Sequence, residues 1–281
     1  MKYCRKGDYY YYLLLLLLFN KKFQCALMVK KFQAKADDIL IATYPKAGTT
    51  WMIEIMDSIR QGGITKEITT IPSHERTPFL ELSSMGVDLL KDMPSPRLVK
   101  THLPFQLVPQ SFWDKGCKVI YVARNAKDIL VSYFFFHKIT PILPHAGTWD
   151  DFFESFLSGN VVWGSWFDHV TGWWDVREKH QILYVFYEDI LQVSLHLSLG
   201  KWSLCTREIV KHTSFNMMKD NPMTNFSRMP TCIVDVRISP FMRKGQVGDW
   251  KNHFTVAQNQ RFEEEYRRRM AKTSLRFRTE L

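Results

Sequence analysis

The sequence predicts an α/β fold, a single domain in which helices flank a central parallel sheet. Short apolar runs rich in β-branched and aromatic residues occur at 39–42, 98–99, 119–122 and 182–186. These runs are continuously apolar rather than alternating, which is typical of parallel strands buried on both faces. Segments of helical periodicity separate them, as in a layered α/β domain. No internal repeat or low-complexity linker follows residue 30, so we expect no domain boundary there.

The first strand leads into a tight turn and then into a helix. Residues 39–42 are followed by Pro45 and Gly48, which favour a turn. Beyond the turn, apolar residues recur every three or four positions, the pattern of a helix with one buried stripe: Trp51, Met52, Ile55, Met56 and Ile59. A second set has helical spacing and is expected to pack in the core rather than line a site: Trp163, Trp166, Val170, Trp173 and Trp174.

The composition indicates an anionic partner and a reducing environment. The 281 residues include 38 Lys and Arg against 28 Asp and Glu, a formal net charge of +10. This charge suits nucleic acid, an anionic membrane or a phosphorylated nucleotide, and does not choose among them. The five cysteines are scattered, with neither a C-x-x-C pair nor the spacing of metal ligands. We therefore expect a reducing compartment and no structural metal.

Residues 1–30 form an atypical leader. Lys2, Arg5 and Lys21 flank an apolar run of 11 residues at 9–19. The run has the length of a secretory h-region but is shorter than the roughly 20 residues of a membrane-spanning helix, and no small-x-small cleavage site follows it. We expect a poorly ordered leader without stable membrane insertion, followed by one domain at 31–281.

Residues 43–51 (TYPKAGTTW) have the composition of an anion-binding turn. Backbone N–H groups converge at the start of a helix, the helix dipole favours negative charge there, and Lys46 adds a mobile cation. Thr49 and Thr50 add hydroxyl donors. An ordinary glycine-containing turn with a threonine cap would have the same local pattern, so the turn alone does not establish a site.

Polar residues follow two other predicted strands at the point where each ends. Lys100 and His102 follow the strand at 98–99, and Arg124 follows the strand at 119–122. Asn125 is placed to cap the helix that carries Ser132. Because ligands of open parallel sheets bind beyond the carboxyl ends of the strands, these side chains are expected to converge on the lysine-bearing turn.

Five motifs identify a resemblance that covers most of the chain. They are TYPKAGTTW at 43–51, KTHLP at 100–104, YVARNAKD at 121–128, FYED at 186–189 and SPFMRKG at 239–245. Together they resemble the cytosolic sulfotransferases of phenol-type family 1, most closely its C subgroup. The resemblance implies a cytoplasmic enzyme of sulfate conjugation and xenobiotic metabolism that binds no nucleic acid. Its sulfuryl donor would be 3′-phosphoadenosine 5′-phosphosulfate (PAPS), its acceptor the hydroxyl of a small phenolic or other aromatic molecule, and it would need no metal.

The resemblance assigns donor contacts to five parts of the chain. The P-loop-like turn would hold the 5′-phosphosulfate through Lys46, Ala47, Gly48, Thr49, Thr50 and Trp51. The 3′-phosphate, a dianion that needs permanent cations and bidentate donors, would be held by Arg124, Ser132, Arg243, Lys244 and Gly245. The adenine would lie between Trp51 and Phe215, with Tyr187 and Thr213 at its edge.

The resemblance also assigns the chemistry. His102 would be the general base that takes the acceptor's proton, since histidine is neutral near pH 7. Lys46 would stabilise charge on the bridging oxygen, and Lys100 would assist at the transferring group. Lys100 and His102 would also contact the acceptor, with Phe79 and Phe136 as wall residues. Further aromatic candidates for that wall, several of them expected to be core, are Phe105, Phe134, Phe135 and Trp149.

The C-terminal region resembles the family's dimer segment, with departures nearby. The segment 251–260 implies a homodimer, although Gln260 stands where the family's motif ends in glutamate. Thr255 and Gln258 are predicted to form a capping box. The stretch 190–207 is apolar and shorter than the family's polar helix, and 234–237 and the leader also differ. Misplacing a nucleotide contact by about 1 Å costs roughly a hundredfold in rate, so these changes bear on activity.

Two other functions compete with an active sulfotransferase. A P-loop-type nucleotide kinase or ATPase could use Glu188 and Asp189 as magnesium ligands, but the chain lacks G-x-x-x-x-G-K-[ST]. A catalytically impaired nucleotide-binding homologue would keep the family motifs while the altered segments prevent turnover.

Overall fold

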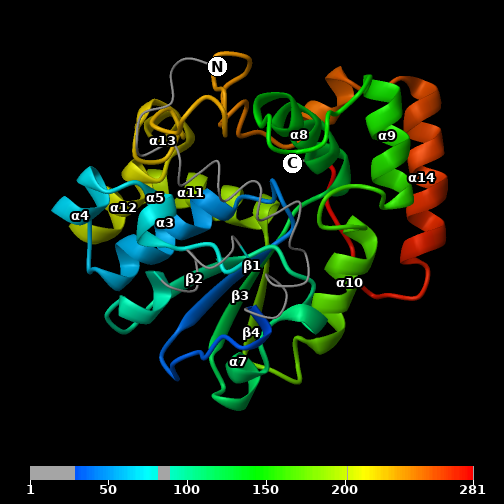
Figure 1. Ribbon diagram of the computed structural model, residues 1–281. Helices are drawn as coiled ribbons and strands as arrows, with labels where there is room; N and C mark the ends of the chain where they lie inside the picture. Colours follow the sequence, from blue (N-terminus) through cyan, green and yellow to red (C-terminus); the bar gives the residue numbers. More distant parts are fainter. Residues whose placement is uncertain (1–28, 82–88, 201, 281) are drawn as a thin grey trace.

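The computed structural model describes residues 29–81, 89–200 and 202–280. Almost all of the predicted leader lies outside these residues. A parallel four-stranded sheet lies at the centre of the described part, in the order β2-β1-β3-β4 (Figure 1). Its strands are β1 (Ile39–Thr43), β2 (Leu98–Thr101), β3 (Lys118–Ala123) and β4 (Ile182–Phe186). All four predicted strands are therefore present, in the predicted parallel arrangement.

Helices cover both faces of the sheet (Figure 1). One group contains α3 (Thr49–Arg60), α4 (Lys66–Thr70), α5 (Ser73–Arg76), α11 (Tyr187–Leu199), α12 (Leu204–His212) and α13 (Phe215–Asp220). The other contains α8 (Ala126–Ile139), α9 (Trp149–Ser158), α10 (Trp166–Val176) and α14 (Val256–Met270). Shorter pieces are α7 (Gln110–Asp114) and the 3₁₀ helices η1 (Phe105–Leu107) and η2 (Asp249–Asn252). The predicted single α/β domain with a flanked parallel sheet is confirmed.

Burial on both faces explains why the strands are continuously apolar. Leu40 and Ala42 of β1 belong to the large core under α8, α9, α10 and α14. Ile41 between them faces the opposite way, into a smaller cluster with Ile53 of α3. Successive strand residues point to opposite faces, so a strand covered on both sides needs apolar residues at every position.

Side-chain caps fix where the main helices begin. The Asn125 side chain accepts a hydrogen bond from the Asp128 amide at the start of α8. Thr255 and Gln258 form the predicted capping box at the start of α14. Such caps satisfy amides that lack a partner inside the helix. No helix in the described ranges is long and apolar enough to cross a membrane.

The prediction that Trp163 belongs to the same helix as Trp166 is wrong, although Trp163 does pack against the core. Helix α10 begins only at Trp166, because Ser165 caps it by accepting from the Asp168 amide. Trp163 and Gly164 both have left-handed backbones, with φ of 66° and 76°, which no helix contains. Trp166 and Trp173 are buried in the core as expected, and Trp163 packs against that core while also lining a cavity.

Candidate active site

The carboxyl ends of the strands border a cavity of about 520 Å³. Every predicted site residue except Ala47, which is fully buried, lines it. These residues come from seven separate stretches of the chain: Lys46, Gly48, Thr49, Thr50, Trp51, Phe79, Lys100, His102, Arg124, Ser132, Phe136, Tyr187, Thr213, Phe215, Arg243, Lys244 and Gly245. The topology of a parallel sheet, in which strand ends share one edge, brings them together.

The turn between β1 and α3 is open at the helix N-terminus. Lys46 and Gly48 have left-handed backbones, with φ of 68° and 99°, and the N-cap Gly48 has no side chain to cap the first amides. The Thr49 hydroxyl is instead paired with the Thr43 hydroxyl at 2.7 Å. The alternative of an ordinary threonine-capped turn therefore does not fit. Uncapped amides at a helix start favour an anion.

Lys46 points from the turn into the cavity, between two aromatic rings. Its Nζ lies 3.9 Å from the centre of the Phe241 ring and 4.7 Å from that of Phe136. Burial, and after it the charges of Arg124 and Arg243, lower the pKa of Lys46 to about 7. In the described part of the chain, no negative charge is among the influences on the Lys46 pKa. An anion bound beside the ammonium group would favour its charged form and raise the pKa toward its ordinary value.

Arg124 and its neighbours have donor capacity that the described protein groups do not use. Arg124 donates to the carbonyls of Lys46 and Gln246, both at 3.1 Å, and its guanidinium lies 4.3 Å from the centre of the Tyr187 ring. Its Nε is buried without a partner, as are Nε of Arg243 and the indole nitrogen of Trp51. Buried donors are normally paired, so this group of cations and N–H donors fits an anionic ligand.

Aromatic rings pack closely on the two glycines of the site. A Cβ at Gly48 would lie 2.8 Å from Cδ2 of Tyr187, and the Tyr187 ring centre is 5.2 Å from that of Trp51. A Cβ at Gly245, where φ is 63°, would overlap the Phe215 ring. These close approaches require glycine, and they hold flat rings around one end of the cavity.

His102 is held in a defined tautomer. Its Nδ1 lies 2.8 Å from the carbonyl oxygen of Thr43. Since a carbonyl only accepts, Nδ1 carries the proton and Nε2 keeps its lone pair. Rings of Phe79 and Trp163 flank the imidazole at 4.9 and 5.3 Å. Burial, together with the charges of Lys100 and Lys46, lowers the pKa of His102 to about 3, so the ring is neutral.

Buried hydrogen bonds fix the backbone of His102 at both its carbonyl and its amide. Tyr121 donates to Nδ1 of His169 at 2.8 Å, and Nε2 of His169 donates to the His102 carbonyl at 3.0 Å. The His102 amide donates to the Glu81 carboxylate, which also accepts from the Thr101 hydroxyl. Sequence reasoning missed these supports, because partners 20 or more positions apart leave no local pattern.

Lys100 lies near the same rings. Its Nζ is 5.3 Å from the centre of the Phe79 ring. Burial lowers its pKa to about 8, and the charge of Glu81 partly opposes that shift. Burial in turn raises the pKa of Glu81 to about 7, against the stabilising hydrogen bonds from His102 and Thr101.

Asp128 is a further support that sequence reasoning missed. It accepts from the amides of Gly248 at 2.9 Å and Trp250 at 3.0 Å, and so ties α8 to the segment that follows residues 243–245. Its neighbour Asn125 donates to Glu188 through both the backbone and side-chain nitrogens, each at 2.9 Å. Glu188 is therefore engaged in a structural network, which counts against its use as a magnesium ligand.

The aromatic candidates for the acceptor wall divide into two sets. Phe79 and Phe136 line the cavity, and Trp163, which we had placed in the core, joins them. The others belong to the large core or pack against it and do not line the cavity: Phe105, Phe134, Phe135 and Trp149. Apolar side chains from 226–241 complete the wall. Within the described ranges, no group of three His, Cys, Asp or Glu side chains could hold a metal ion.

An open turn for an anion beside a buried neutral histidine, at the carboxyl edge of a parallel sheet, is the arrangement of a P-loop-like group-transfer enzyme. The sulfotransferase domain model matches residues 36–274, and the chain belongs to the sulfotransferase family. Sulfotransferase 1C2 of Homo sapiens is 52% identical over 265 residues, 90% of each chain. Sulfotransferase 1A1 of Rattus norvegicus is 49% identical over 265 residues, 90% of this chain and 91% of its own.

Solved structures agree with this membership. The mouse sulfotransferase SULT7A1, crystallised with PAP, superposes with a TM-score of 0.70 at 33% identity, over 90% of this chain and 91% of its own. Retinol dehydratase superposes with a TM-score of 0.79 over 90% of this chain and 86% of its own, but at 24% identity it supports the fold alone. The predictions of a sulfotransferase enzyme, with PAPS as donor and a hydroxyl acceptor, are confirmed.

Proposed function

We propose that this sulfotransferase acts on small phenolic or other aromatic acceptors, with the site residues in the roles that the sequence predicted. The observation that carries the proposal is the convergence of Lys46, His102 and Arg124 on one cavity that also has aromatic walls. A flat apolar acceptor suits walls of Phe79, Phe136 and Trp163.

The donor would occupy the cationic end of the cavity. The uncapped amides and hydroxyls of the turn, with Lys46, would bind the 5′-phosphosulfate. Arg124, Arg243 and the 243–245 backbone would bind the 3′-phosphate. The unpaired donors on Arg124, Arg243 and Trp51 support this placement, as does the lowered pKa of Lys46, which an adjacent anion would raise. Trp51 and Phe215 would enclose the adenine.

The reaction would then be an in-line displacement at sulfur. The acceptor oxygen forms a bond to sulfur while the bond from sulfur to the bridging phosphate oxygen breaks. The hydroxyl proton passes to Nε2 of His102, whose lone pair is free because Nδ1 is bound to Thr43. Lys46 would stabilise the charge that grows on the leaving oxygen. Burial is the main cause of the low pKa of His102, and the charges of Lys100 and Lys46 add to it. A bound anionic donor would offset the contribution of these charges.

A transfer assay combined with a binding assay tests the proposal. Labelled sulfate from PAPS should appear on a simple phenol without added magnesium, and 3′,5′-adenosine bisphosphate should bind in calorimetry under the same conditions. Binding without transfer would favour the impaired homologue. A strict requirement for ATP and magnesium would favour the kinase reading.

The dimer and the compartment belong to the same proposal. Val256, in the segment 251–260, leaves 77% of its side chain exposed, the largest such fraction among the large apolar residues of the described chain. The dimer itself rests on the resemblance of 251–260 to the family's dimer segment, and Val256 offers an exposed apolar position in it at which to test the interface. Replacing Val256 with glutamate should convert a dimer to a monomer in light scattering.

The free thiols of Cys117, Cys205 and Cys232 suit the reducing cytoplasm, which cell fractionation would test.

A further inference from the structure

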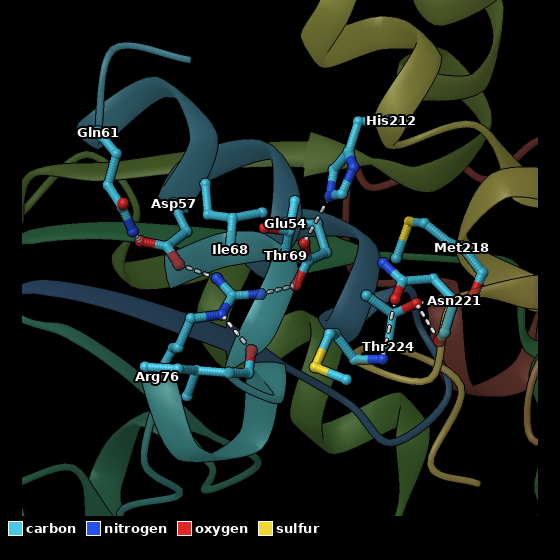
Figure 2. Close-up of polar contacts among 12 residues, drawn as sticks. Glu54, Asp57, Gln61, Ile68, Thr69, Arg76, His212, Met218, Asn221 and Thr224 are labelled. Carbon is cyan, nitrogen blue, oxygen red and sulfur yellow. Dashed lines mark hydrogen bonds and ion pairs between the residues drawn. The ribbon is translucent and has the colours of Figure 1, made fainter. Parts of the chain in front are cut away.

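A buried ionic network joins the two groups of residues proposed to enclose the adenine. At its centre Arg76 of α5 pairs with the carboxylates of Glu54 and Asp57 on α3, and its Nε donates to the Ile71 carbonyl at 2.9 Å (Figure 2). All three charged side chains are at most 1% exposed. A buried guanidinium held by two carboxylates fixes the orientation of both acids.

The free oxygen of Glu54 faces α12. Nε2 of His212 lies 3.1 Å from Oε2 of Glu54, while the other oxygen of Glu54 accepts from Arg76. Figure 2 shows the imidazole pointing from α12 down to the carboxylate. Since a carboxylate accepts, Nε2 donates. His212 is the last residue of α12, and its side chain is 12% exposed.

Glu54 and His212 each lie close in the sequence to residues that are proposed to contact the adenine. Glu54 follows Trp51 by three positions on α3, about one helical turn. His212 directly precedes Thr213, and Phe215 begins α13 two positions later. One hydrogen bond therefore links the helix that carries Trp51 to the segment that carries Thr213 and Phe215.

The far end of that segment is also tied down. The amide of Ser73, at the start of α5, donates to the Met223 carbonyl at 2.9 Å. The loop that holds Met223 is closed by Thr224, whose hydroxyl donates to the Met218 carbonyl at 2.6 Å, and by Asn221, which accepts from the Met223 amide at 2.9 Å (Figure 2). Helix α13 is thus bracketed between His212 and Met223, both attached to the α3–α5 unit.

We propose that Glu54 and His212 are positioning residues that hold Thr213 and Phe215 in register with Trp51 and so set the affinity for the nucleotide. The inference rests on the proposed nucleotide site. The contact between His212 and Glu54 attaches the C-terminal end of α12 to α3. The position of Thr213 and Phe215 therefore depends less on the altered stretch 190–207.

Three variants test the proposal. His212→Phe keeps an aromatic ring but cannot donate, whereas His212→Gln places an amide N–H near the position of Nε2. His180→Gln is the matched control, because His180 is a half-buried histidine whose ring centre lies 4.4 Å from that of Trp113, next to the amino end of β4 and outside the cavity. Each protein is titrated calorimetrically with 3′,5′-adenosine bisphosphate, well below its melting temperature.

His212→Phe should weaken binding about tenfold, a change of 1.4 kcal/mol. It should also raise the KM for PAPS to a similar extent, with kcat at saturating donor within about twofold. His212→Gln should recover most of the affinity, and His180→Gln should bind like the unchanged protein. If His212→Phe melts at a lower temperature but binds the nucleotide as tightly as before, the positioning role of His212 is refuted and the proposed nucleotide site is not. Failure of the unchanged protein to bind the nucleotide would overturn the proposed function, and this inference with it.

Discussion

Replacing Gly245 with alanine tests how the candidate adenine site is built. A Cβ at this position would overlap the ring of Phe215, so the ring must move. The backbone φ of 63° adds strain of roughly 1–2 kcal/mol for any residue with a Cβ. Loss of an aromatic stacking surface costs about 1–3 kcal/mol per base, which corresponds to a dissociation constant roughly 5- to 150-fold higher for 3′,5′-adenosine bisphosphate.

Gly62 provides the matched control for this experiment. Its φ is 72°, close to that of Gly245, but a Cβ there would have no neighbour within 4 Å. Both alanine variants should therefore melt roughly 2–6 °C lower, while only Gly245→Ala should lose nucleotide affinity in calorimetry. Equal affinities for the two variants would refute the reasoning, since the backbone strain is common to both and the contact with Phe215 is not.

Three further predictions concern the chemistry and its supports. His102→Ala should lower kcat for sulfuryl transfer by at least about a hundredfold and change nucleotide affinity by less than about twofold, since its role is proton transfer; a parallel loss of affinity would argue for a binding role. Because the pKa of Lys46 is about 7 in the free protein, and an anion favours its charged form, nucleotide binding at pH 8 should take up protons and weaken as the pH rises above 7. Calorimetry in buffers of different ionisation enthalpy measures this uptake, and uptake that persists unchanged in Lys46→Met would exclude Lys46 as its source. Asp128→Ala leaves the amides of Gly248 and Trp250 without their acceptor, at about 1–3 kcal/mol each, so thermal melts should shift down by roughly 4–10 °C, and an unshifted melt would show that other groups replace the carboxylate.

The fold, and the clustering of the candidate site residues at one edge of the sheet, could be predicted because both depend on local pattern and topology. Each buried strand is a short apolar run followed by polar residues that line the cavity, as with His102 after β2 and Arg124 after β3. The rule that parallel strand ends share an edge then brings them together. The sequence alone predicts the anion-binding turn, because Lys46 and Gly48 lie between a predicted strand and a predicted helix.

The supports of the site could not be predicted in this way. Trp163 has helical spacing with the later tryptophans, but Trp163 and Gly164 have left-handed backbones and α10 begins only at Trp166. His169 and Glu81 act on His102 across 67 and 21 positions, and the pair of Glu54 and His212 spans 158. Such contacts arise from packing between elements, and periodicity within one element carries no information about them.

The central claim is that separate stretches of the chain enclose one doubly anionic nucleotide. A crystal structure of the complex with 3′,5′-adenosine bisphosphate tests it most directly. The 5′-phosphate should lie on the turn at Lys46, the 3′-phosphate should contact Arg124, and the adenine should lie between Trp51 and Phe215. A nucleotide bound elsewhere, or bound here with its phosphates away from these cations, would contradict the account.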